Sequence, residues 1–147
     1  MDDAARTEQD RLLDIMRNDL YVAVVSDVLD SIGLLNQAMD DRLRPLSPQM
    51  RLVGRAHTVM TADIYERSDD PYHSEIAAVD ALKPGDVMVA DTNRSSRTCF
   101  WGELLSTAAT ARGATGCAID GHTRDALRIM EMGFPLFCTG FRPVDSS

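Results

Sequence analysis

Strand-like and helix-like segments alternate along the second half of the chain, and this alternation constrains the fold more than any other feature. Short apolar runs with the length of buried strands occupy residues 87–90, 116–119 and 135–138. Helical patterns occupy residues 74–82, 101–111 and 125–132. Strands and helices in this order predict a largely parallel sheet with helices packed on it. We therefore expect an α/β fold.

The first half of the chain carries weaker signals. Residues 7–18 have the apolar spacing of an amphipathic helix, and the β-branched run 21–25 is typical of a short strand. Ser26 then has the position of a helix N-cap, and Gly33 the position where that helix ends. Residues 51–62 suit a further strand or a bent strand pair. Because 147 residues have room for one core, we expect a single domain.

The charge and the apolar runs argue against two classes of partner. A formal net charge of −8 does not favour binding to nucleic-acid phosphates, although it can attract a basic protein. No segment approaches the roughly 20 apolar residues of a membrane span. The start of the chain also lacks the pattern of a signal peptide, so a cytoplasmic protein is expected.

The cysteines favour reduced thiols over a disulfide framework or a metal site. Cys99, Cys117 and Cys138 are odd in number and scattered, with no CxxC pair and no zinc spacing to a histidine. Cys117 and Cys138 lie within apolar runs and are expected in the core.

A polar segment, Gly121–Asp125, follows the strand predicted at 116–119. In open α/β sheets, ligands bind beyond the carboxyl ends of the strands. Arg124 offers a permanent, fork-shaped cation for a carboxylate or a developing enolate oxygen. Asp125 offers a hard oxygen ligand of the kind that Mg²⁺ takes, often with only one or two carboxylates and several waters.

A second polar position lies at the start of the helix predicted at 101–111. The amides of Leu104 and Leu105 have no partner inside that helix, and with the helix dipole they form a seat for a carboxylate or phosphate. Gly102 allows a ligand close to the backbone. Glu103 can accept hydrogen bonds from metal-bound waters or relay a proton. Because no GxGxxG or GxxxxGK[ST] pattern is present, a nucleotide is not favoured.

Taken one at a time, the same residues are explained better by structural roles. Acidic residues in a first helical turn interact favourably with the helix dipole, which would explain Glu103 and Asp125. Arg124 can be a surface ion-pair partner. Asp91 is placed either to cap a loop or to line the site. Residues expected to be structural are Asp27, Asp120 and His122. The residues alone leave both interpretations open.

Several motifs, taken in order, resemble the RraA-like family, which contains 4-hydroxy-4-methyl-2-oxoglutarate aldolases and regulators of ribonuclease activity. The resemblance runs from about Tyr21 onward. It rests on the segments 26–30 with Gly33, 44–46, 53–56, 84–86, 101–105, Gly113 with Gly116, 120–125 and 133–135.

The resemblance implies a fold and a site. The fold is a swivelling β/β/α three-layer domain, assembled into trimers or dimers of trimers. The family's aldolases carry an acidic residue separated by twenty positions from an Arg-Asp pair, a pattern that falls here on Glu103, Arg124 and Asp125. Asp125 would then bind Mg²⁺ or Mn²⁺, Arg124 would lie near the keto oxygen, and the backbone of residues 102–105 would hold the pyruvate carboxylate.

The implied activity is metal-dependent cleavage of a small 2-oxo acid to pyruvate through its enolate. Aldol cleavage and oxaloacetate decarboxylation share that enolate, so the resemblance implies a class II pyruvate aldolase with decarboxylase activity. The alternative is a non-catalytic regulator that binds a basic partner protein such as a ribonuclease. Two departures accompany the resemblance: Glu103 replaces an Asp, and the family continues past the position of Ser147, which implies a shortened member.

Overall fold

The computed structural model describes residues 3–66 and 68–146, and the chain divides into two compact units. One unit extends to Asp40 and holds two helices, and the other begins at Asp41 and holds every strand that the model describes. None of the described helices is long and apolar enough to cross a membrane.

The first unit consists of α1 (Asp3–Asn18) and α2 (Val22–Ser31). The helix predicted at 7–18 is confirmed, but the strand predicted at 21–25 and the N-cap at Ser26 are wrong, because α2 begins directly after Tyr21. Helix propensity differs little between β-branched and other residues, so a β-branched run does not prevent a helix. As predicted, the helix stops before Gly33, whose φ of +82° favours glycine.

The central sheet of the second unit has five strands in the order β1-β7-β5-β3-β2. The strands are β1 (Arg44–Pro45), β2 (Arg55–Met60), β3 (Asp86–Asp91), β5 (Gly116–Asp120) and β7 (Leu136–Cys138). All neighbours pair in parallel except β1 with β7. The predicted α/β class with a largely parallel central sheet is therefore confirmed.

The structure also contains a second sheet of three short parallel strands, which the sequence did not predict. It consists of β4 (Cys99–Trp101), β6 (His122–Thr123) and β8 (Gly140–Phe141), in that order. Trp101 was predicted to begin a helix and His122 to lie in a loop, but each belongs to one of these strands. Strands of two or three residues are too short to show a periodic pattern, and they form here by pairing with distant segments.

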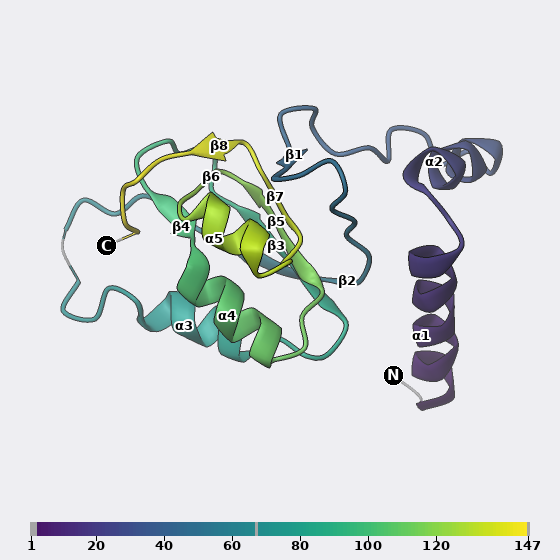
Figure 1. Cartoon of the computed structure of the whole chain (residues 1–147), viewed down its shortest axis with the longest axis horizontal. Helices are drawn as coiled ribbons and strands as arrows, with labels where there is room; N and C mark the ends of the chain where they lie inside the picture. Colours follow the sequence, from purple (N-terminus) through teal and green to yellow (C-terminus); the bar gives the residue numbers. More distant parts are fainter. Residues whose placement is uncertain (1–2, 67, 147) are drawn as a thin grey trace. The chain divides into compact units, whose positions relative to one another are not determined.

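Three helices, α3 (His73–Asp80), α4 (Glu103–Ala111) and α5 (Ala126–Glu131), lie together beside the strands (Figure 1). Helix α4 contacts both other helices and β5. The core beneath them is formed by buried side chains that include Met88, Trp101, Ile119, Ile129, Phe134 and Leu136. The predicted burial of Cys117 and Cys138 is confirmed, and Cys99 is buried as well.

Helix α3 has one buried side. Its Ile76 is 52% exposed, whereas Val79 and, just beyond the helix, Leu82 lie in the core. Ala78 is half-buried as well. Residues 75, 78, 79 and 82 have the spacing of one helix face, and residue 75 is a glutamate. The helix therefore turns one carboxylate toward the interior of the unit.

The carboxyl ends of the central parallel strands are level with one another. Met60 at the end of β2 is in register with Asp91 of β3, and Asp91 is in register with Asp120 of β5. The segments that leave this edge lead into β4 and β6, so the polar residues that follow them gather at one end of the unit.

Candidate functional site

The parallel pairing of β4 with β6 brings together two segments that are distant in the sequence. Trp101 is in register with Thr123, and the Trp101 carbonyl accepts hydrogen bonds from the Arg124 amide at 3.0 Å and the Thr123 hydroxyl at 2.9 Å. Because parallel strands leave a sheet in the same direction, Gly102 and Glu103 emerge beside Arg124 and Asp125. The predicted grouping of these four residues is what the structure shows.

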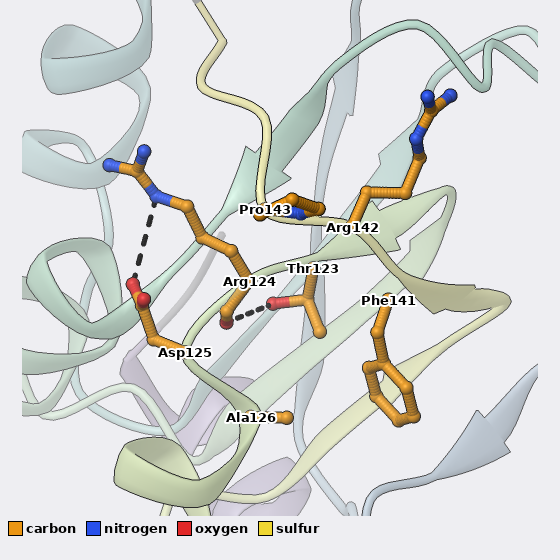
Figure 2. Close-up of a pocket in the computed structure, with 7 residues that line it drawn as sticks. All are labelled: Thr123, Arg124, Asp125, Ala126, Phe141, Arg142 and Pro143. Atoms are coloured by element: carbon orange, nitrogen blue, oxygen red, sulfur yellow. Dashed lines mark hydrogen bonds and ion pairs between the residues drawn. The ribbon is translucent and has the colours of Figure 1, made fainter.

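Asp125 connects the two segments. Its backbone is left-handed, with a φ of 57°, and its carboxylate makes no hydrogen bond to cap its own helix α5. Instead, Asp125 Oδ2 accepts the Glu103 amide at 3.1 Å and lies 3.7 Å from Arg124 Nε (Figure 2). The carboxylate thus stabilises the N-terminus of α4.

Gly102 permits this arrangement. A Cβ at position 102 would lie 2.8 Å from Asp125 Oδ2 and 3.2 Å from Arg124 Cγ, both closer than ordinary contact. The protein's own ion pair, and not only a ligand, therefore requires glycine here.

The first turn of α4 keeps two open amides. Asp125 takes the Glu103 amide, and the Gly102 carbonyl takes the Ser106 amide. In the described part of the chain, no acceptor is recorded for the amides of Leu104 and Leu105. These two amides are the donors that the sequence analysis assigned to a carboxylate seat, which stays a prediction, and the side chain of Glu103 is exposed beside them.

Arg124 is partly buried and held from two sides. Its side chain is 33% exposed, and Nη1 forms a 3.0 Å ion pair with Asp145, whose carboxylate also accepts the Tyr72 hydroxyl. Arg124 and Asp125 line a cavity of about 440 Å³ with Thr123, Ala126, Phe141, Arg142 and Pro143 (Figure 2). This volume suits a small ligand.

Arg142 also lines this cavity, a position that no pattern in the sequence indicated. Its guanidinium points away from Arg124 in Figure 2 and donates to the Ser96 carbonyl. Arg142 therefore adds positive charge to the wall without converging on Arg124.

The donor set fits a weakly held, hydrated cation. Within residues 3–66 and 68–146, no three His, Cys, Asp or Glu side chains group closely enough to hold a metal ion. Asp125 Oδ1, however, has no hydrogen bond or ion pair to the described residues. One free carboxylate oxygen beside a cavity fits Mg²⁺, which keeps most of its waters, and does not fit an all-protein cage.

Asp91 and Asp120, which also follow strands of the central sheet, make contacts within the protein. Asp91 Oδ1 accepts the Asn93 amide at 2.7 Å and so caps the loop after β3. Asp120 Oδ1 forms a 3.1 Å ion pair with Arg42. Burial raises the pKa of the Cys99, Cys117 and Cys138 thiols, which keeps them protonated and argues against a cysteine nucleophile.

Glu75 is the residue near the site that the sequence analysis missed. It lies on the inward face of α3, and its Oε2 accepts the Ser146 hydroxyl at 3.1 Å. Burial, followed by the neighbouring Asp145 carboxylate, raises the pKa of Glu75 against the opposing effects of Ser146 and Arg124. The helical spacing of Ala78, Val79 and Leu82 would have indicated its inward position.

A family model described as RraA-like, Aldolase/RraA, matches residues 22–147. The chain belongs to the RraA-like family. A curated relative, protein DlpA of Legionella pneumophila, is 30% identical over 118 residues, which are 80% of this chain and 19% of DlpA.

Two solved structures share the fold. Streptomyces coelicolor RraAS2, described as an unusual member of the RNase ES inhibitor RraA family, is 27% identical with a TM-score of 0.77, covering 92% of this chain and 66% of its own. A protein described among novel cellulases from gut-associated microbes is 28% identical with a TM-score of 0.82, covering 93% of this chain and 61% of its own. Because these names differ, the shared fold fixes the family and not the activity.

Proposed function

We propose that the protein is a divalent-metal-dependent lyase that cleaves small 2-oxo acids to pyruvate, as a pyruvate aldolase with oxaloacetate decarboxylase activity. The observation that carries this proposal is the link between the Arg124-Asp125 pair, which lines a cavity, and the first turn of α4, whose Glu103 amide donates to Asp125. The family description, which includes aldolases, supports it.

The α4 N-terminus and Arg124 would bind the head of the substrate. The amides of Leu104 and Leu105 donate to the C1 carboxylate, and the dipole of α4 favours its negative charge. The Arg124 guanidinium then faces the C2 keto oxygen. Asp145 and Asp125 hold this guanidinium in place, so little side-chain freedom is lost when substrate binds.

Asp125 would hold the divalent cation through its free Oδ1, with waters in the remaining positions. Bound there, Mg²⁺ or Mn²⁺ would polarise the keto group as a Lewis acid. Glu103, exposed one residue after Gly102, is placed to accept hydrogen bonds from the cation's waters.

The bond to C3 breaks when its electron pair moves toward the keto group. Arg124 stabilises the negative charge that develops on that oxygen. The same charge develops whether an aldehyde or ketone leaves, as in aldol cleavage, or carbon dioxide leaves, as in decarboxylation. One site therefore serves both reactions. We further propose a cytoplasmic protein that works as a homo-oligomer, a trimer or a dimer of trimers.

Asp125→Asn tests the proposal without disturbing the backbone, because Asn tolerates the left-handed conformation better than Ala. In a coupled pyruvate assay with oxaloacetate, wild-type activity should require Mg²⁺ and disappear with EDTA. Asp125→Asn should lose it about 100-fold or more, since it replaces the carboxylate that would hold the cation. Asp80→Asn, which removes an exposed α3 carboxylate paired with Arg112, is the control. Unchanged activity in Asp125→Asn would rule out the proposed role.

The second candidate function is a non-catalytic regulator that binds a basic partner protein. It is favoured by the net charge of −8 and by the likeness to RraAS2, which is described within a family of RNase inhibitors. Salt-sensitive binding of such a partner, unchanged in Asp125→Asn and found in a protein that releases no pyruvate, would support it.

A further inference from the structure

A second cavity, of about 450 Å³, lies beside the carboxyl ends of β2 and β3. Its wall carries hydroxyl groups from four segments of the second unit, with Phe100 as an apolar element. One residue from each segment is Thr61, Ser74, Ser95 and Ser146. The size and the mixed lining suit a small, polar organic group.

Glu75 is the carboxylate that α3 presents to this cavity. The opposite face of α3 carries Asp80, which is exposed and pairs with Arg112. Glu75 lies instead in line with Val79 and Leu82, and it lines the cavity wall. An inward carboxylate costs stability unless it is partnered, and its one recorded hydrogen bond comes from Ser146.

Residues 143–146 contribute to the walls of both cavities. Pro143 lines the cavity at Arg124, and Ser146 lines the cavity at Glu75. Between them, Asp145 pairs with Arg124. Arg124 is also near enough to Glu75 to act on its charge. Arg124 and Glu75 are therefore near neighbours, although each lines a different cavity.

The geometry points to Glu75 as the general base and acid of the aldol cleavage, with the second cavity holding the hydroxyl-bearing half of a 4-hydroxy-2-oxo acid. This inference rests on the proposed lyase function and adds the group that moves the proton. Glu75 touches the C4 end of the substrate, whereas Arg124 and the α4 amides hold the C1–C2 end.

The proton balance closes within the site. The Glu75 carboxylate takes the proton of the C4 hydroxyl, the C4–O bond becomes a carbonyl, and the C3–C4 electron pair forms the pyruvate enolate. The protonated Glu75 then returns that proton to C3, which yields pyruvate and regenerates the carboxylate. Decarboxylation of oxaloacetate has no hydroxyl proton to remove, so its bond-breaking step does not need Glu75.

The charges around Glu75 suit this role. Burial and the Asp145 carboxylate raise its pKa, while the Ser146 hydroxyl and Arg124 lower it. Asp63 and Asp70 line the same cavity from the loop after β2. A carboxyl group whose pKa lies above its ordinary range is a better match for proton transfer near neutral pH.

The test compares two substrates in the Glu75→Gln variant. With Mg²⁺ present, pyruvate release is measured from 4-hydroxy-4-methyl-2-oxoglutarate and from oxaloacetate. The kcat for aldol cleavage should fall about 100-fold or more, whereas decarboxylation should stay within about threefold of wild type. Asp80→Asn, on the opposite face of α3, should change neither. A variant that loses both activities equally, or neither, would overturn the role of Glu75.

Folding and titration provide independent readouts. Because ionised Glu75 is disfavoured in the folded state, it costs stability as pH rises through its raised pKa, so Glu75→Gln should not lower the Tm near neutral pH. Ser146→Ala removes a hydrogen bond that lowers the Glu75 pKa, so the acid limb of the aldolase pH profile should move to higher pH. An unmoved limb in Ser146→Ala would count against Glu75 as the base. A wild type inactive on both compounds would overturn the proposed function itself.

Discussion

Asp125 shows how one residue serves structure and the proposed chemistry together. Its left-handed backbone turns the carboxylate away from α5 and onto the N-terminus of α4. One oxygen thereby caps a helix, and the other has no partner among the described residues. Asp125 can therefore have both a structural role and the proposed functional one. The helix that its carboxylate stabilises is α4, and not α5, which it precedes.

Gly102→Ala tests this arrangement at the residue scale. The new Cβ would lie 2.8 Å from Asp125 Oδ2, so the carboxylate must move and lose the Glu103 amide. We expect pyruvate release to fall at least tenfold, with a stability loss of about 1 kcal/mol from the weakened cap, measured by urea unfolding.

Gly133→Ala is the matched control. A Cβ there meets no atom within 4 Å, but the φ of +69° strains an L-residue. This variant should lose about 1 kcal/mol of stability and keep its activity. Equal activity losses in the two variants would show that the close packing at Gly102 has no special role.

At the scale of elements, the long strands and helices follow from periodicity, whereas the short ones do not. The runs at 87–90 and 116–119 are apolar because both faces of these strands are covered. Strands β4, β6 and β8 have only two or three residues and are fixed by pairing between segments far apart in the chain. The strand predicted at 21–25 was wrong, because the residues from Val22 onward lie in α2 and the low helix propensity of β-branched residues is too small to prevent a helix.

A buried hydrogen-bond chain fixes β4 to α4. The Trp101 indole donates to Ser106 Oγ at 2.8 Å, and Ser106 Oγ donates to the Gly102 carbonyl at 2.9 Å. Both side chains are almost fully buried. Ser106→Ala leaves the indole N–H without a partner, so unfolding in urea should show a loss of about 1–3 kcal/mol.

Thr107→Ala, one position along α4, is the comparison for Ser106→Ala. Thr107 is exposed, and its hydroxyl bonds only within the helix and to Met132. Its replacement should change stability by less than about 0.5 kcal/mol. A Ser106→Ala variant as stable as Thr107→Ala would show that the hydrogen bonds of Ser106 contribute little to the stability of the protein.

For the whole molecule, the candidate site lies where the strands of two parallel sheets end. The sequence alone identified Arg124, Asp125 and the α4 amides, because polar residues after buried strands gather at one edge of such sheets. It did not reveal Glu75 or Asp145, since Glu75 lies within a predicted helix, away from any strand end, and Asp145 lies in an irregular segment. Glu75 and Asp145 come near Arg124 through contacts between α3, the turn before α5 and the segment 143–146, which lie far apart in the sequence.

The most direct measurement of the central claim is calorimetric titration of pyruvate into the protein with and without Mg²⁺. If Arg124, Asp125 and the α4 amides form one metal-assisted site, wild-type protein binds pyruvate more tightly with Mg²⁺ than with EDTA. Arg124→Ala should then weaken binding by about 2–3 kcal/mol, and Asp125→Asn should remove the dependence on Mg²⁺. Pyruvate affinity that is the same with and without Mg²⁺, or unchanged in both variants, would contradict the account.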